Sequence, residues 1–379
     1  YLCCYNLTTE MVEKKLCLPE GNYYTRMHDN ILSHEGKLYL IPFNGRDVLV
    51  FDKETEEFEC ISLELYDASG YKFYTAMIYK DILYLFPEKV AVNVQEPYVM
   101  IQVDLSGKES VKHTNFDLQI KPVKGAYYEV FDRNYFISEN TLYILLQMTN
   151  KVLEYDLEKE TWNIIAIGKK ENSYATMYVE QDKFYLINQD GNVTVWNQKE
   201  DKGYEYLNAV EGHVVENKEK FVAFASGFRY KNEIYFVPGF ANKMLVLDCE
   251  KISEAFFSKD LYRFDKRMEL PMYAEYYSRT ILMQEKLYIW SYINYKLHII
   301  DLGRKSYEYK MIKTQFNNDE LTQLYTDLKQ NRKMGFPENI SCYSNLEFWI
   351  EALFANNNRD KRDRIEDCIG KQILHNVIF

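Results

Sequence analysis

The sequence predicts an all-β fold of the propeller class, because one strand-rich unit recurs along most of its 379 residues. The first observation is a repeated tyrosine flanked by apolar residues on both sides. The second is an aspartate or asparagine that follows each tyrosine after 12 to 20 residues. These second markers recur at intervals of 41 to 53 residues. Such a period in strand-rich sequence is typical of a propeller with one four-stranded blade per repeat.

Six complete repeats carry both markers. The marker tyrosines are Tyr39, Tyr84, Tyr143, Tyr185, Tyr235 and Tyr288. The second markers are Asp52, Asp104, Asp156, Asn197, Asp248 and Asp301. The longest spacing falls in the second repeat, which indicates a loop insertion over residues 88–99. Two further connections are long, and we expect them to be excursions on one face of the propeller: 112–132 and 203–221.

The strand around each marker tyrosine is apolar on both faces. In the first complete repeat, Tyr39 follows Leu38 and precedes Leu40 and Ile41. A half-exposed strand would alternate apolar and polar residues, so this pattern indicates burial between two neighbouring blades. The tyrosine ring then fills the space between blades, and its hydroxyl needs a polar partner. Asp52 precedes a hairpin, and we expect its carboxylate to accept hydrogen bonds from the amides of that turn.

Residues 1–18 match only the second half of a repeat, with Tyr5 and Asn6 in the places of Phe51 and Asp52. Two alternatives follow. The missing strands precede Tyr1, or the N-terminal pair adds to a strand from elsewhere in the chain. Because the last repeat is complete, we favour seven blades with the first one partial, over residues 1–313.

The pattern changes after residue 313, and the remaining residues, 314–379, predict a small α-helical appendage. Asn318 or Asp319 can cap a helix whose leucines recur at helical spacing. A capping box at Ser344 precedes a second apolar stripe, and a third follows Asp360. These stripes either pack on each other and on the propeller or dock a partner.

The composition excludes several classes of partner. A net charge of −11 makes the protein acidic and argues against nucleic acid or an anionic membrane as the main partner. No apolar run is long enough to predict a transmembrane helix. The seven cysteines form no CxxC pair, and their odd number predicts reduced thiols and a cytoplasmic location.

No catalytic or metal motif stands out. The six histidines are spread along the chain, and none pairs with another at the spacing of metal ligands. A nucleophile elbow, a phosphate-binding loop and a dinucleotide fingerprint are all absent from the sequence. The carboxylates gather mainly in hairpins such as 54–59. The sequence therefore favours a non-catalytic protein and predicts no metal and no cofactor.

The first strand of each propeller blade lines the central channel, and here that strand precedes each marker tyrosine. The position eleven residues before the tyrosine is mostly aromatic: His28, Phe73, Tyr174, Phe224 and Tyr277, with Asp132 in the third repeat. The position nine residues before it is polar: Asn30, Thr75, Asn134, Thr176, Ser226 and Arg279. A loop insertion near Asp132 can shift this register by one residue.

Such rings suggest a pocket at the channel mouth, with aromatic walls and a polar floor. This composition suits a sugar, a peptide tip or another small polar molecule. The alternative is that small polar residues simply fit the crowded, hydrated axis of a propeller. Both readings remain open from the sequence.

The repeats resemble kelch repeats over residues 1–313. The resemblance rests on the strand KLYLIPF, on the hairpins VFDKET and EYDLEKETW, and on the aromatic after each hairpin, as in Phe58, Trp162 and Tyr307. The paired glycines of that family are missing. The resemblance implies a propeller that works as a binding platform, although some kelch-like propellers are enzymes, including copper oxidases and sugar-acid isomerases.

The resemblance leads to a hypothesis and an alternative. We expect a cytoplasmic, bacterial protein-interaction scaffold or ligand-binding platform without catalytic activity, whose partner is a protein. The alternative is a sugar-binding or carbohydrate-modifying propeller that uses the channel mouth. The C-terminal segment GKQILHNVIF is similar to the tails of bacterial glycan-assembly proteins, which links this alternative to glycan assembly.

Overall fold

The structure is a computed structural model, and the statements below concern only the residues that it describes. These are residues 2–16, 18–19, 28–43, 47–63, 72–88, 98–107, 110–116, 131–168, 172–215, 222–248, 251–256, 277–291, 296–311, 313–314, 319–320 and 322.

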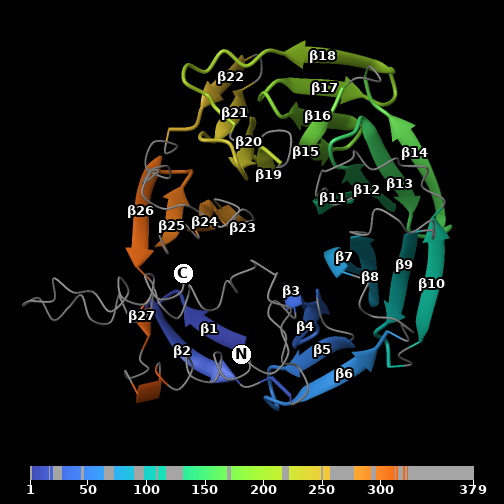
Figure 1. Cartoon of the computed structure of the whole chain (residues 1–379), viewed down its shortest axis with the longest axis vertical. Helices are drawn as coiled ribbons and strands as arrows, with labels where there is room; N and C mark the ends of the chain where they lie inside the picture. The colour runs from blue at the N-terminus through green and yellow to red at the C-terminus, as the bar shows by residue number, and fades with distance from the viewer. Residues whose placement is uncertain are drawn as a thin grey trace, which may run out of the picture. The chain divides into compact units, whose positions relative to one another are not determined.

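Within these ranges the strands form six four-stranded sheets and one three-stranded sheet (Figure 1). In each four-stranded sheet, four strands consecutive in the chain lie in order, and the paired strands run antiparallel. This is the topology of a β-propeller blade. The six complete repeats read from the sequence are therefore confirmed as six blades.

The chain divides into two compact units, each described here by itself. One unit, Met27–Phe264 with Glu275–Thr280, contains five blades. Blade 1 has β3 His28–His34, β4 Lys37–Pro42, β5 Asp47–Asp52 and β6 Phe58–Ser62. Blade 2 has β7 Lys72–Tyr79, β8 Ile82–Glu88, β9 Tyr98–Asp104 and β10 Val111–Phe116. Blade 3 has β11 Phe131–Ser138, β12 Thr141–Leu146, β13 Lys151–Asp156 and β14 Thr161–Ala166.

Two more blades complete this unit. Blade 4 has β15 Tyr174–Glu180, β16 Lys183–Asn188, β17 Val193–Asn197 and β18 Lys202–Tyr206. Blade 5 has β19 Phe224–Tyr230, β20 Glu233–Pro238, β21 Leu245–Asp248 and β22 Lys251–Glu254. The first strand of each blade contacts the first strand of the next, from β3 through β7, β11 and β15 to β19. The polar positions predicted for the channel lie on these first strands.

The other unit contains Tyr1–Arg26, Asp265–Ala274 and Ile281–Phe379. It holds most of the sixth blade, whose strands are β23 Tyr277–Met283, β24 Lys286–Ser291, β25 Lys296–Asp301 and β26 Ser306–Met311. The N-terminal pair, β1 Leu2–Asn6 and β2 Met11–Leu16, forms a three-stranded sheet with β27 Lys313–Thr314.

Strand β27 pairs in parallel with β2, so that Met11 lies opposite Lys313 and Val12 opposite Thr314. The Lys310 ammonium also lies 2.8 Å from a carboxylate oxygen of Glu10. The N-terminal pair thus gains a strand from the far end of the chain, as in the second alternative, although the sequence favoured the first. The described residues form six four-stranded blades and this three-stranded sheet.

The predicted helical appendage lies almost wholly outside the described residues. Only Asp319, Glu320 and Thr322 of this segment are described, with helical backbone, so the helical appendage itself stays a prediction. Three further expectations stay predictions: the apolar stripes after Ser344 and Asp360, the similarity of the GKQILHNVIF segment, and the domain boundary after residue 313. No helix in the described part of the chain is long and apolar enough to cross a membrane.

The predicted burial around the marker tyrosines is confirmed in four blades. Tyr39, Tyr84, Tyr143 and Tyr235 are buried, and Tyr185 and Tyr288 are half-buried. The Tyr143 hydroxyl donates a hydrogen bond to the Glu154 carboxylate at 3.4 Å. Burial, with the nearby charge of Glu154 as a second cause, raises the pKa of Tyr143 to about 12. The ring therefore fills the interior as a neutral phenol whose hydroxyl has a polar partner.

The second marker closes its hairpin as predicted. The Asp52 carboxylate accepts hydrogen bonds from the amides of Glu54 at 2.8 Å and Thr55 at 3.1 Å. These bonds hold the pKa of Asp52 below its usual value. The same contact recurs in other hairpins, at Asn6, Asp104, Asp156, Asn197 and Asp301.

Aromatic side chains join blade 2 to blade 3. Phe116 of β10 is fully buried, and its ring centroid lies 5.3 Å from that of Trp162 in β14, with the rings edge to face. Phe116 also lies 6.2 Å from Tyr155 of β13 and 6.5 Å from Phe131 of β11. One residue of the outermost strand of blade 2 thus contacts three strands of the neighbouring blade.

This packing predicts a graded loss of stability. Phe116→Ala should lower the free energy of unfolding by about 3–5 kcal/mol, because it removes a buried ring and leaves a cavity. Phe116→Leu retains most of the apolar volume and should lower it clearly less. Urea unfolding followed by tryptophan fluorescence measures both values, and an equal loss for the two variants would contradict the cavity argument.

Candidate functional site

The first strands share a β-bulge at the predicted channel positions. In β3, His28 pairs with Pro42 and Asn30 with Ile41, so that Asp29 is left over. The same irregularity occurs in β7, β15 and β19. In β11, Phe131 occupies the place of the aromatic residue. Residues 132–134 are unpaired and separate Phe131 from the next paired residue, Tyr135. The register shift predicted near Asp132 is therefore present, and it amounts to one extra residue.

The aromatic positions are part of the core. Phe73, Tyr174 and Phe224 are each at most 1% exposed, and Phe131 is 2% exposed. Each lies in a hydrophobic cluster with residues of a neighbouring blade. The expectation that Phe73, Tyr174 and Phe224 form the walls of an open mouth was wrong, because apolar rings are more stable between the packed blades. The Tyr277 and Arg279 side chains lie outside what the structure describes.

The extra residue of β11 places a carboxylate among the first strands. Asp132 is fully buried, and its Oδ2 accepts a hydrogen bond of 2.6 Å from the Thr176 hydroxyl of β15. Its Oδ1 accepts bonds from the Asn134 backbone amide at 3.1 Å and the Asn134 side-chain amide at 2.9 Å. Gln147 donates a further bond to this oxygen at 3.4 Å. The carboxylate thus has donors from two blades.

Two more predicted residues extend this network to blades 2 and 5. The Thr75 hydroxyl of β7 donates to the backbone carbonyl of Asp132 at 2.6 Å. The side-chain amide of Asn134 donates to the backbone carbonyl of Ala225 in β19 at 2.6 Å. We call Thr75, Asp132, Asn134, Gln147 and Thr176 the Asp132 network. It connects the first strands of four consecutive blades.

The structure therefore brings together three of the predicted polar residues: Thr75, Asn134 and Thr176. Ser226 is hydrogen-bonded elsewhere, to Thr280 at 3.2 Å. The sequence-based prediction did not select Asp132 and Gln147 as site residues. The sequence did contain one indication of their role. Asp132 occupies a position that is aromatic in the other repeats, and a polar residue buried there needs hydrogen-bond partners.

The Asp132 network is suited to holding blades together rather than to catalysis. An ionised carboxylate offers about four acceptor sites, and that of Asp132 already accepts four hydrogen bonds from described residues. A general base needs a lone pair within reach of a substrate proton. The carboxylate is instead surrounded by the protein's own donors, so this arrangement is structural.

His28 differs from the residues at the equivalent position of the other blades, because its ring carries two nitrogens. Both ring nitrogens are shielded from solvent, and neither has a hydrogen-bond partner of normal geometry in the described residues. Burial lowers the pKa of His28 to about 4, although the nearby backbone of Asp47 opposes part of this shift. His28 is therefore a neutral ring at pH 7, where the other blades use phenylalanine or tyrosine.

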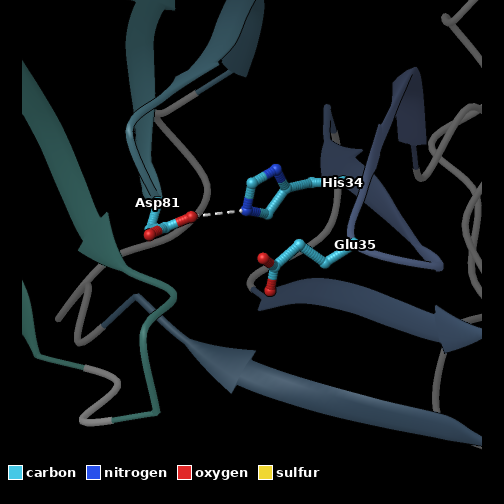
Figure 2. A group of neighbouring side chains, drawn as sticks. All are labelled: His34, Glu35 and Asp81. Carbon is cyan, nitrogen blue, oxygen red and sulfur yellow. Dashed lines mark hydrogen bonds and ion pairs between the residues drawn. The ribbon is translucent and has the colours of Figure 1, made fainter.

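A second group of polar side chains lies at the β-turns between the first and second strands of blades 1 and 2 (Figure 2). His34 ends β3, Glu35 lies in the turn that follows it, and Asp81 lies in the corresponding turn after β7. The Nε2 atom of His34 is 2.9 Å from Oδ1 of Asp81. One ligand atom from each residue lies within 4.8 Å of the others. Sequence spacing did not reveal this group, because the blade repeat separates its members.

The connection from blade 4 to blade 5 exposes apolar side chains. Leu207 is 70% exposed and Val214 is 54% exposed. The backbone between them is nevertheless held firmly. The Asn208 amide donates to Oδ1 of Asn192 at 2.8 Å, and the Val214 amide donates to Oδ1 of Asn242 at 2.8 Å. We call residues 207–215 the blade 4–5 connection; it belongs to one of the long excursions predicted from the sequence.

Comparisons with known proteins match the architecture alone. No family model and no curated protein matches the chain. One similar solved structure, described as "YCF48 bound to D1 peptide", has 10% identity and a TM-score of 0.48, covering 76% of this chain and 82% of that chain. Another, the computationally designed Ika8 protein, has 10% identity and a TM-score of 0.46, covering 76% and 77%. The function is therefore argued from the residues of this chain.

The Asp132 network predicts that removing the Thr176 hydroxyl destabilises the fold. Thr176→Val retains the shape of the side chain but leaves Oδ2 of Asp132 without its 2.6 Å donor. The free energy of unfolding should fall by about 1–3 kcal/mol, the cost of leaving a buried polar group unsatisfied. Thr161→Val, at an exposed position of β14, is the matched control and should change stability by less than about 0.5 kcal/mol. Equal effects in urea titrations would refute the role of the network.

The lowered pKa of His28 predicts that the free energy of unfolding depends on pH. Above pH 6.5 the ring is neutral in both the folded and the unfolded chain. As the pH falls from 6.5 to about 4, only the unfolded chain binds the proton, so stability decreases by up to about 3 kcal/mol.

His28→Phe inserts the kind of residue that the other blades use here and removes this titration. We expect the variant to gain stability over the wild type as the pH is lowered from 7.5 to 4.5. Urea midpoints measured across this range would provide the test, and a constant difference between the two proteins would count against it.

Proposed function

We propose that this propeller is a protein-interaction scaffold that binds an extended segment of a partner protein at the blade 4–5 connection. The observation that carries the proposal is the pair Leu207 and Val214, two apolar side chains that are exposed although their backbone is fixed. Binding residues commonly lie on loops that a rigid scaffold positions.

The connection is ordered by its own polar side chains and by its neighbours. Asn208 binds the blade 4 loop through the Asp190 carbonyl at 2.9 Å, and Asn242 of blade 5 donates to the Gly212 carbonyl at 2.9 Å. Lys243 donates to the Glu211 carbonyl at 2.7 Å. A preorganised loop loses little conformational entropy when a partner binds, which favours affinity.

The local charge indicates the chemistry of the partner. Glu205, Glu211 and Asp190 are exposed around the connection. Together with the net charge of −11, they favour a segment with an apolar anchor flanked by lysine or arginine. We place this interaction in the cytoplasm, in keeping with the free thiols of Cys4 and Cys60.

The sugar-binding alternative has less support. It relies on polar side chains that a ligand can reach, and Thr75, Asn134 and Thr176 already use theirs in the Asp132 network. The predicted aromatic walls Phe73, Tyr174 and Phe224 are inaccessible to solvent. A glycan array provides a direct comparison with peptide binding.

The proposal is tested by selecting peptides from a displayed random library on the purified protein. We expect enrichment of peptides with an apolar anchor and basic flanks. The double variant Leu207→Asp, Val214→Asp should bind the selected peptides at least about tenfold more weakly, because apolar anchors near the centre of an interface carry most of the affinity.

Leu7→Asp is the matched control, because Leu7 is also an exposed leucine, at 46%, but lies in the β1–β2 turn. This variant should bind the peptides as the wild type does. Unchanged binding by the double variant, or binding of glycans with no peptide enrichment, would reject the proposal. Circular dichroism of each variant confirms that it folds.

A further inference from the structure

We propose that His34, Glu35 and Asp81 bind a divalent transition-metal ion, Zn²⁺ by preference, and that this ion connects blade 1 to blade 2. His34 and Glu35 come from the first turn of blade 1, and Asp81 comes from the same turn of blade 2. The inference is independent of the proposed peptide site, which lies on the connection between blades 4 and 5.

The geometry brings three potential ligands to one point. Figure 2 shows the His34 imidazole and the Asp81 carboxylate pointing toward one another, with the Glu35 carboxylate below them. Their ligand atoms all lie within 4.8 Å of one another, and the closest pair is 2.9 Å apart. Small rotations of the side chains can bring the atoms to the distances of about 2.0–2.2 Å at which nitrogen and oxygen bind Zn²⁺.

The charges at this junction differ from those at the neighbouring junctions. Between blades 2 and 3, the Lys80 ammonium lies 2.9 Å from the Glu158 carboxylate. Between blades 4 and 5, Arg229 pairs with Glu180. Between blades 1 and 2, two carboxylates converge instead on a histidine. The Glu35 side chain is exposed, and no described residue forms an ion pair with it.

A bound cation would compensate the negative charge of these two carboxylates. Two carboxylates and one imidazole together supply a charge of −2 when the histidine is neutral, which a divalent ion compensates. The side chain of His34 is 23% exposed and that of Asp81 is 52% exposed, so an ion and its remaining water ligands can reach them.

The ligand set selects the type of metal. Imidazole nitrogen suits zinc and the later transition metals, whereas Mg²⁺ and Ca²⁺ favour sites made entirely of oxygen ligands. Three protein ligands leave a coordination position for water, as in open zinc sites. The site therefore differs from a closed structural zinc site, which has four protein ligands.

The test is calorimetric titration of ZnCl₂ into untagged, metal-free protein. We expect one site per chain, no comparable heat from MgCl₂ or CaCl₂, and a higher melting temperature with zinc. His34→Gln and Asp81→Asn should each weaken zinc binding by about tenfold or more, since even residues that only orient a metal ligand have effects of 10–100-fold. X-ray absorption of the zinc complex should show only nitrogen and oxygen neighbours.

Asp182→Asn is the matched control. Asp182 occupies the same turn position in blade 4, where it pairs with Lys199 at 2.6 Å, so its removal alters an equivalent carboxylate without touching the proposed ligands. This variant should bind zinc as the wild type does. The proposal is overturned if no saturable zinc site exists, if sulfur neighbours identify a cysteine site, or if Asp182→Asn weakens binding as much as Asp81→Asn.

Discussion

The buried carboxylate of Asp132 constrains the arrangement of blades 2 to 5. A carboxylate without access to water is costly unless donors surround it, and here the donors come from two blades. The backbone of the same residue accepts a bond from a third blade, and Asn134 binds a fourth. The first strands of blades 2 to 5 can therefore satisfy this group only in one relative position.

This constraint explains why the candidate binding features lie away from the Asp132 network. Side chains that hold the blades together are hydrogen-bonded to one another and buried, which leaves them little capacity for a ligand. At the ends of the blades, some side chains form ion pairs between neighbouring blades, such as Lys80 with Glu158, but others stay exposed. There, exposed leucine and valine at the blade 4–5 connection and the His34, Glu35 and Asp81 group remain accessible on a rigid framework.

The fold was largely predictable because a propeller repeats one local pattern. Tyr39, Tyr84, Tyr143 and Tyr235 identified strands buried on both faces, and Asp52 and its counterparts identified hairpins. The candidate site was only partly predictable. Thr75, Asn134 and Thr176 were selected from the polar position of each repeat as ligand-binding residues, and that role stays a prediction, because in the structure they bond neighbouring blades. The aromatic position was interpreted as an exposed wall, whereas Phe73, Tyr174 and Phe224 are buried. Burial of Phe73 or Phe224 depends on a neighbouring blade, which the local sequence does not describe.

By itself, the sequence determined the number of complete blades and the position of the strands and hairpins within each blade, and it indicated where a one-residue shift can occur, near Asp132. These properties depend on local periodicity and on turns, which adjacent residues encode. The tertiary structure decided that β27 pairs with β2, that the Asp132 network forms, and that His34 meets Asp81 across 47 residues. Such contacts depend on which sheets become neighbours and on how side chains share the space between them, and no local pattern specifies either.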